Sequence, residues 1–150
     1  MMDQRISLIT LGVRDIIRSA GFYESLGWCR VDSPDGVVVF DLLGQTLGLY
    51  PRENLANDLG LDPAQIGGFL GITLGYNVRE KPEVAAILAK VEPAGGRVLK
   101  PASDVFWGGH HGFFTDPDAH VWEVAFNPFS PLAANGAFQW NGAASGETPP

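Results

Sequence analysis

The sequence predicts an α+β fold built from two tandem βαβββ modules, and three observations support this prediction. First, strand-like and helix-like stretches follow one another in the same order twice. Second, the tetrapeptide ITLG occurs at residues 9–12 and again at residues 72–75. Third, the hairpin sequence of residues 36–49 lies over residues 111–124 without gaps, at a constant offset of 75 residues (36 to 111, 49 to 124).

Composition limits the classes of function. The chain has 150 residues, of which 45% are hydrophobic and 18% charged, so it can form a packed core. Its net charge of -7 argues against nucleic acid or an anionic membrane surface as a partner. The single cysteine excludes an internal disulfide, and no apolar run reaches the roughly 20 residues needed to span a bilayer. The start, MMDQRISLIT, has no secretory pattern, so we expect a cytoplasmic protein.

The first module is expected at about residues 5–51. Residues 5–15 are rich in β-branched side chains and predict a strand. Residues 15–28 have apolar side chains at near-helical spacing, with Gly27 as the stop signal of a helix. Residues 37–41 and 46–50 predict two strands joined by a tight turn at Gly44.

The second module is expected at about residues 68–127, after a loop with one short helical turn at residues 52–68. A strand at 68–78, a helix at 81–96, a strand at 97–109 and a hairpin at 111–126 repeat the earlier order. The turn of that hairpin, from Asp116 to His120, has the composition of a tight loop. Residues 1–129 are thus predicted to form one domain, and 130–150 a C-terminal tail whose last ten or so residues are disordered.

The opening and closing segments resemble one known family. The segment ISLITLGVRDIIRSAGFYESLGW and the segment GFFTDPDAHVWEVAFNPF are similar to the first and last parts of the vicinal oxygen chelate superfamily. This is the group of glyoxalase I, the bleomycin-resistance proteins and the extradiol dioxygenases, and the resemblance covers about residues 5–129. It implies a cup-shaped mixed sheet formed by the two modules, and a homodimer, in which modules are sometimes exchanged.

The resemblance also implies where a metal would bind. Metal-dependent relatives take one ligand from each of four strands, typically His or Glu, and the matching positions here are Leu8, Gly48, Thr73 and Glu123. An alignment on the two ITLG stretches replaces Thr73 by Gly71. In either alignment only Glu123 is a good ligand, whereas an open catalytic site usually keeps at least three. We therefore expect no metal and no other cofactor.

The remaining candidates concern the lining of the cup. Because side chains alternate along a strand, Glu123 faces away from Trp122 and Val124 and is expected to point into the cup as a polar anchor or a general base. By the same alternation at most one of His110 and His111 can line the cup; alternation does not decide which, and His110 is named as the candidate donor. Trp107, Tyr50 and Thr73 are the other candidate ligand contacts, since a cup without a metal must bind through aromatic and polar groups.

Two hypotheses of function follow. In the first, the protein resembles the bleomycin-resistance group and binds a small organic molecule in the cup without a metal. In the second, it is a glyoxalase-like lyase or isomerase, or a dioxygenase relative that has lost most metal ligands, with Glu123 as the general base. Neither the residues nor the resemblance names the small-molecule ligand.

Overall fold

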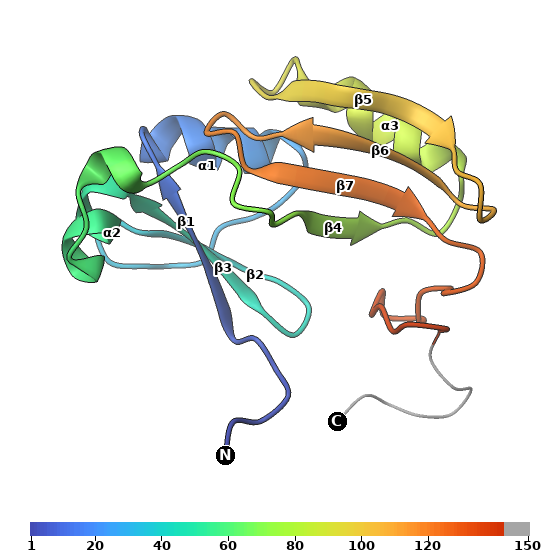
Figure 1. Ribbon diagram of the computed structural model, residues 1–150, viewed down its shortest axis with the longest axis horizontal. Coiled ribbons are helices and arrows are strands. Elements are labelled where there is room, and N and C mark those ends of the chain that lie inside the picture. The colour runs from blue at the N-terminus through green and yellow to red at the C-terminus, as the bar shows by residue number, and fades with distance from the viewer. Residues whose placement is uncertain (143–150) are drawn as a thin grey trace.

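The computed structural model describes residues 1–142 and contains two mixed β-sheets, which lie side by side (Figure 1). The N-terminal sheet has the strand order β1-β3-β2, with β1 at Leu8–Val13, β2 at Val38–Asp41 and β3 at Thr46–Pro51. The C-terminal sheet has the order β4-β7-β6-β5, formed by β4 (Leu74–Asn77), β5 (Arg97–Asp104), β6 (His110–Thr115) and β7 (Val121–Phe126). Within the described residues, no strand of one sheet pairs with a strand of the other.

This arrangement confirms the predicted α+β class and the two βαβββ-like modules. In the first module the second strand is reduced to one isolated bridge, between Val31 and Val39. The second module is complete, although β4 starts only at Leu74, so the predicted strand at 68–78 is mostly irregular. Gly67, Gly68 and Gly71 have positive φ angles, which are incompatible with a continuous strand there.

Three α-helices accompany the sheets within residues 1–142. Helix α1 (Ile16–Ser25) begins at Asp15, whose carboxylate accepts the backbone N–H groups of Ile17 and Arg18 at 3.0 Å, as expected for an N-cap. Helix α3 (Pro82–Val91) has Pro82 in its first turn and packs on one face of the C-terminal sheet. Helix α2 (Arg52–Leu59), followed by the 3-10 turn η1 (Pro63–Gln65), occupies the segment predicted to be a loop with one helical turn.

One hydrophobic core spans both modules. Leu11, Phe40 and Leu49 of the N-terminal sheet belong to the same buried cluster as Val84 of α3 and Trp122 of β7. Helix α1 joins the two parts, since the Phe22 ring lies 6.2 Å from the Phe114 ring of β6. The junction of the modules is therefore on the helix-covered side of the C-terminal sheet, and the other face of this sheet carries no helix (Figure 1).

The rest of the described chain adds two observations. Residues 127–142 follow β7, and Arg79 donates to the backbone carbonyls of Ala133 and Ala134 at 2.9 and 3.1 Å. The disorder predicted for the end of the tail concerns residues that from 143 onward lie outside the described part of the structure. No helix within residues 1–142 is long and apolar enough to cross a membrane.

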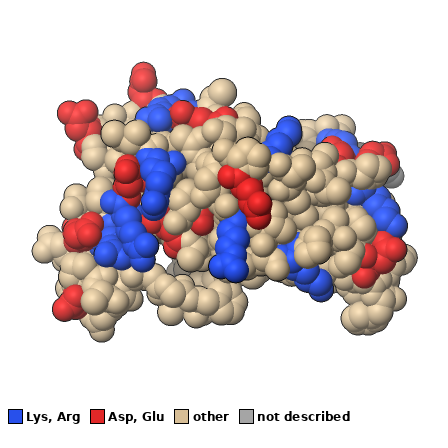
Figure 2. Space-filling view, turned by 90° about the horizontal axis from the view of Figure 1, so that it is seen from above, with Lys and Arg blue, Asp and Glu red and all other residues tan. Residues whose placement is uncertain are grey.

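Charged residues are mixed rather than segregated on the side of the molecule seen in Figure 2. Basic and acidic side chains alternate there, separated by uncharged surface. Because the two signs are interspersed, this side presents no continuous field of one charge, in spite of the net charge of -7.

Candidate ligand-binding site

The face of the C-terminal sheet that is not covered by helices, hereafter the open face, carries Glu123. Trp122 and Val124, its neighbours along β7, are buried in the core on the helix side, so alternation turns Glu123 to the open face. Its strand neighbours are Gly75 of β4 and Phe113 of β6. The side chain is 34% exposed, as expected for a group that is partly enclosed and still reachable.

His111 is the partner of Glu123. Its Nδ1 atom lies 3.1 Å from Glu123 Oε2, and its ring packs edge-on against Phe113 at a centroid distance of 4.9 Å. A carboxylate can only accept hydrogen bonds, so Nδ1 carries the proton and donates it to Oε2. The site is thus a hydrogen-bonded acid–imidazole pair with an aromatic ring beside it.

Each member of the pair keeps one free polar atom. Within residues 1–142, Glu123 Oε1 has no hydrogen-bond donor, since His111 Nδ1 bonds to Oε2. His111 Nε2 is buried without a partner among the described residues, and in the neutral imidazole it is an acceptor. Because His111 is only 15% exposed, Oε1 of Glu123 is the more accessible of the two acceptors.

The structure places the candidate His110 on the opposite face of the sheet, so His111 is the histidine beside Glu123. His110 pairs with Phe126 in the sheet, and its Nδ1 lies 2.9 Å from Asp104 Oδ1. Lys81 Nζ lies 2.7 Å from the same oxygen. Lys81 first and His110 second lower the pKa of the Asp104 carboxyl, so this trio is a surface ion-pair cluster on the helix side.

The register of the β6–β7 hairpin shows which of the two histidines lies on the same face as Glu123. Phe113 pairs with Glu123 and His111 with Ala125, so odd-numbered residues of β6 share a face with odd-numbered residues of β7. The predicted turn from Asp116 to His120 already fixes this register. Its two end residues pair with each other, since the Asp116 N–H donates to the His120 carbonyl, and the strands pair outward from them. This register places His111, and not His110, on the face of Glu123.

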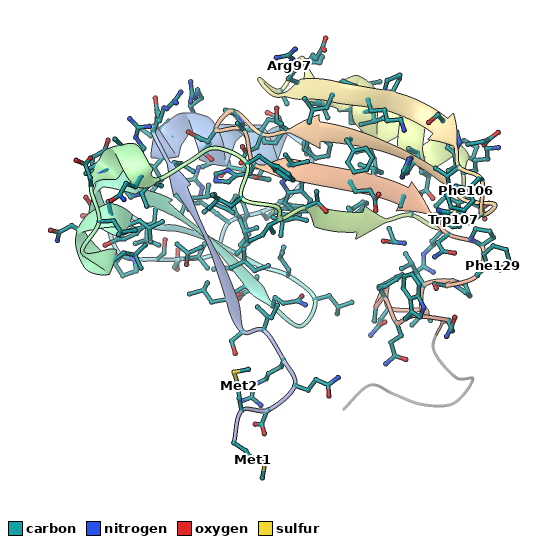
Figure 3. All side chains as sticks on the ribbon, viewed as in Figure 1. Met1, Met2, Arg97, Phe106, Trp107 and Phe129 are labelled. Atoms are coloured by element: carbon teal, nitrogen blue, oxygen red, sulfur yellow. The ribbon has the colours of Figure 1, made fainter. Side chains whose placement is uncertain are left out.

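The other three candidates belong to other segments of the fold and form no hydrogen bond with the acid–imidazole pair within residues 1–142. Trp107 is in the turn between β5 and β6, beside Phe106 and near Phe129 at one end of the C-terminal sheet (Figure 3). Its ring covers Gly109, where a Cβ atom would come within 2.1 Å of it. Thr73 is exposed and precedes β4.

Tyr50 belongs to the N-terminal sheet and is engaged with helix α2. Its hydroxyl donates to Asp58 Oδ2 at 3.0 Å, and this hydrogen bond is the main cause of a raised pKa of the Tyr50 phenol. The contact fastens α2 to the end of β3. The structure therefore gives Tyr50 a local structural contact.

The four positions matched to the metal ligands of relatives do not fit a divalent ion. Leu8 and Gly48 lie side by side on β1 and β3, since a Cβ atom on Gly48 would be 3.7 Å from Leu8 Cδ1, and neither offers a side-chain ligand. On the other sheet, His111 is the only further side chain of the described residues beside Glu123 that could act as a metal ligand, which makes two ligands in total. Within residues 1–142, no three His, Cys, Asp or Glu side chains come together in a manner that could hold a metal ion. We therefore derive no chemical step through a metal.

Two tandem βαβββ-like modules that form two mixed sheets define a class of α+β proteins. Residues 5–124 match the family model described as Glyoxalase/Bleomycin resistance protein/Dioxygenase superfamily, which covers most of the chain. The chain belongs to this superfamily. A search of curated proteins gives no significant match.

Solved structures agree with this assignment. A glyoxalase-related enzyme from Fulvimarina pelagi is 36% identical, with a TM-score of 0.84 over 91% of this chain and 98% of that one. A glyoxalase/bleomycin resistance protein/dioxygenase family enzyme from Burkholderia phytofirmans has 16% identity and a TM-score of 0.73, over 81% of this chain and 98% of that one. A lactoylglutathione lyase from Agrobacterium tumefaciens has 21% identity and a TM-score of 0.63, over 84% and 96% of the two chains. The last two likenesses concern the fold alone.

Proposed function

We propose that this protein binds a small organic molecule on the open face of the C-terminal sheet, without a resident metal. The observation that carries the proposal is the Glu123–His111 pair, in which Oε1 of a partly exposed carboxylate lacks a donor within the described residues. A ligand with an N–H or O–H group would supply that donor. Hydrogen bonds to a charged acceptor contribute about 1.5–3 kcal/mol each, enough to orient a ligand held by apolar contacts.

His111 has a positioning role in this proposal. Its Nδ1–H group holds Oε2, which fixes the carboxylate and leaves Oε1 directed to the ligand. Phe113, packed against the His111 ring, supplies apolar surface next to the carboxylate. The ligand class that fits is therefore a small, partly apolar molecule with at least one hydrogen-bond donor.

The test is a thermal-shift screen of small aromatic, thiol-conjugate and drug-like compounds, followed by calorimetry on the hits. Glu123→Gln keeps the shape of the side chain but removes the charge, and should weaken binding by about tenfold or more. Glu92→Gln, at the exposed end of α3, is the matched control and should bind as the parent protein does. Equal affinity in all three proteins would refute the assignment of Glu123.

A second candidate function is a lyase or isomerase reaction with Glu123 as the general base. Oε1 is reachable and free of donors within the described residues, as proton abstraction from a carbon acid requires. In an isomerisation the carboxylate takes a proton from one carbon and returns it to a neighbouring atom, so no oxidant or reductant is needed. Chromatography of a bound compound after incubation separates the two functions: recovery of intact compound indicates binding, and conversion that Glu123→Gln abolishes indicates catalysis.

We also propose a homodimer. Leu8 on edge strand β1 is 56% exposed, and Phe69, Leu70 and Ile72 before edge strand β4 are exposed as well. Edge strands with apolar side chains favour association with another chain. A second copy that covers these residues would bring an N-terminal sheet next to an open face.

A further inference from the structure

We propose a second ligand site, distinct from the open face, in a cavity between helices α1 and α3 on the helix side of the C-terminal sheet, and infer that it takes a planar aromatic carboxylate. The cavity has a volume of about 270 Å³. Small-molecule sites have volumes of roughly 300–1,000 Å³, so this cavity suits a ligand of one or two fused rings. Tyr76 and Glu123 lie on adjacent strands, β4 and β7, but face opposite sides of the sheet, which separates the two sites.

Aromatic side chains form half of the wall. Trp28 stacks on Tyr23 at 5.2 Å with an angle of 14° between the rings, and Trp122 stacks on Phe114 at 6.1 Å with an angle of 2°. Trp28 and Trp122 meet edge to face at 5.8 Å, which links the two stacks into one wall. Tyr76 adds an exposed fifth ring at the opening. Such a surface favours flat, apolar ligands through stacking and edge-to-face contacts.

Two polar groups of the wall, the Tyr23 hydroxyl and the Trp122 indole N–H, are hydrogen-bonded within the protein, which holds their rings in place. The Tyr23 hydroxyl donates to Asp116 at 2.7 Å and accepts from the Trp122 indole N–H at 3.2 Å. Because these groups are hydrogen-bonded to each other and to Asp116, they are not available to a ligand and do not select it. Selection depends on the charged groups at the rim.

The rim favours an anion. Glu83, Ile87 and Lys90 lie along one side of α3 at spacings of four and three residues and line the cavity. Glu83 Oε2 accepts the backbone N–H of Glu80 at 2.7 Å, so its charge is directed to the N-terminus of the helix. Lys90 forms no ion pair within residues 1–142. Glu83 also forms no ion pair within these residues, but its carboxylate accepts a backbone N–H group. The ammonium group of Lys90 has neither kind of partner in this part of the chain, and a carboxylate attached to a ring would pair with it.

The experiment is calorimetric titration of the full chain with 2-naphthoate and with its neutral counterpart, 2-naphthamide. The carboxylate should bind more tightly than the amide, and the difference should shrink as salt is added, because an exposed ion pair is screened. Lys90→Met should weaken naphthoate binding by about two- to fivefold, the range for an exposed ion pair, and leave the amide unaffected. Lys81→Met, at the other end of the helix and paired with Asp104, is the matched control and should behave as the parent.

Ile87→Trp tests the location, because a larger side chain at this half-buried position would fill the cavity and abolish binding of 2-naphthoate. Lys90→Met changes only a surface side chain, so it remains informative if Ile87→Trp unfolds the protein. Glu123→Gln separates this site from the open face and should leave naphthoate affinity unchanged. Absence of naphthoate binding, equal binding by the parent and Lys90→Met, or loss of binding in Glu123→Gln would overturn the proposal.

Discussion

Asp116, in the turn between β6 and β7, joins the two modules through its buried carboxylate. Oδ2 accepts from the Tyr23 hydroxyl of α1 and lies 2.7 Å from His120 Nδ1, while Oδ1 accepts the backbone N–H groups of Asp118 and His120 at 2.9 Å. The turn composition predicted a loop-forming role for Asp116, and the structure adds the contact with α1. A residue that serves both a turn and a module junction has more influence on stability than a turn residue alone.

Asp116→Ala should lower the free energy of unfolding by about 3 kcal/mol or more, because it leaves several buried donors without an acceptor. Tyr23→Phe removes a single hydroxyl and should cost about 1–1.5 kcal/mol. Urea unfolding followed by circular dichroism measures both changes. Asp41→Ala, which loses only a surface contact with Thr46, is the control, and an equal effect of the Asp41 and Asp116 changes would contradict the role of the buried network.

The same network predicts how stability depends on alkaline pH. Burial, followed by the negative charge of Asp116, raises the pKa of the Tyr23 phenol well above 10.0. Below pH 10 the phenol is protonated in both the folded and the unfolded state, so its contribution to stability is complete. Above pH 10 only the unfolded state loses the proton, so the free energy of unfolding should fall with rising pH.

Ultraviolet titration of the folded protein tests this prediction. Of the three tyrosines, Tyr23 should not ionise before the protein unfolds, and in Tyr23→Phe the loss of stability above pH 10 should be smaller. Ionisation of all three phenols in the folded protein would contradict the buried position of the Tyr23 hydroxyl.

At the scale of the elements, Gly96 connects helix α3 to strand β5, and its Cα atom is closely surrounded by neighbouring atoms. A Cβ atom on Gly96 would lie 2.5 Å from the Thr115 carbonyl oxygen and 2.7 Å from Phe22 Cε2. The close approach brings β5 against β6 and lets α1 pack over the C-terminal sheet. Gly96 therefore fixes the position of both helices that line the proposed second site.

Gly96→Ala should destabilise the protein by about 1–3 kcal/mol, because the neighbouring backbone oxygen cannot move away. Gly21→Ala in helix α1 is the matched control, since a Cβ atom there meets nothing within 4 Å. It should be neutral or stabilise the protein by up to about 1 kcal/mol. Thermal unfolding of both variants provides the comparison, and equal melting temperatures would contradict the tight junction.

Periodicity predicted the elements with a clear apolar pattern and missed those without one. The strands around residues 8–13, 46–51 and 121–126 and helices α1 and α3 were all predicted from their patterns. Helix α2 was missed because its sequence, RENLANDL, is polar, and only Ala56 is buried. It is stabilised instead by the Tyr50–Asp58 hydrogen bond and by Gly60, which ends the helix with a φ of 71°. Such contacts depend on tertiary placement, which no local pattern reveals.

The candidate site, like the secondary structure, was predicted in part. Alternation placed Glu123 opposite Trp122 and Val124, and this orientation is confirmed. Alternation alone left open which of His110 and His111 faces the cup, because the answer depends on the register of the hairpin. The aromatic cavity could not be predicted, because Trp28 and Trp122 are brought together only by the packing of α1 across the module boundary.

At the scale of the whole molecule, the proposed homodimer gives a prediction about mass. Size-exclusion chromatography with light scattering at micromolar concentration should give twice the monomer mass. Leu8→Asp should shift the protein to the monomer, whereas Leu59→Asp on α2, with nearly the same exposed fraction, should leave the dimer intact. A monomeric parent protein would refute the dimer, and a dimer in both variants would place its interface elsewhere.

Metal independence is the central claim, and titration of the chelator-free protein with zinc and nickel in a calorimeter tests it most directly. The matched positions supply Glu123 beside Leu8, Gly48 and Thr73, and His111 raises the number of donors only to two. Two donors give a weak, exchangeable site, whereas firm binding in an open site needs about three. We predict no stoichiometric binding at nanomolar affinity. One equivalent of tightly bound ion, lost in Glu123→Ala, would contradict the proposal and assign metal-dependent chemistry to the open face.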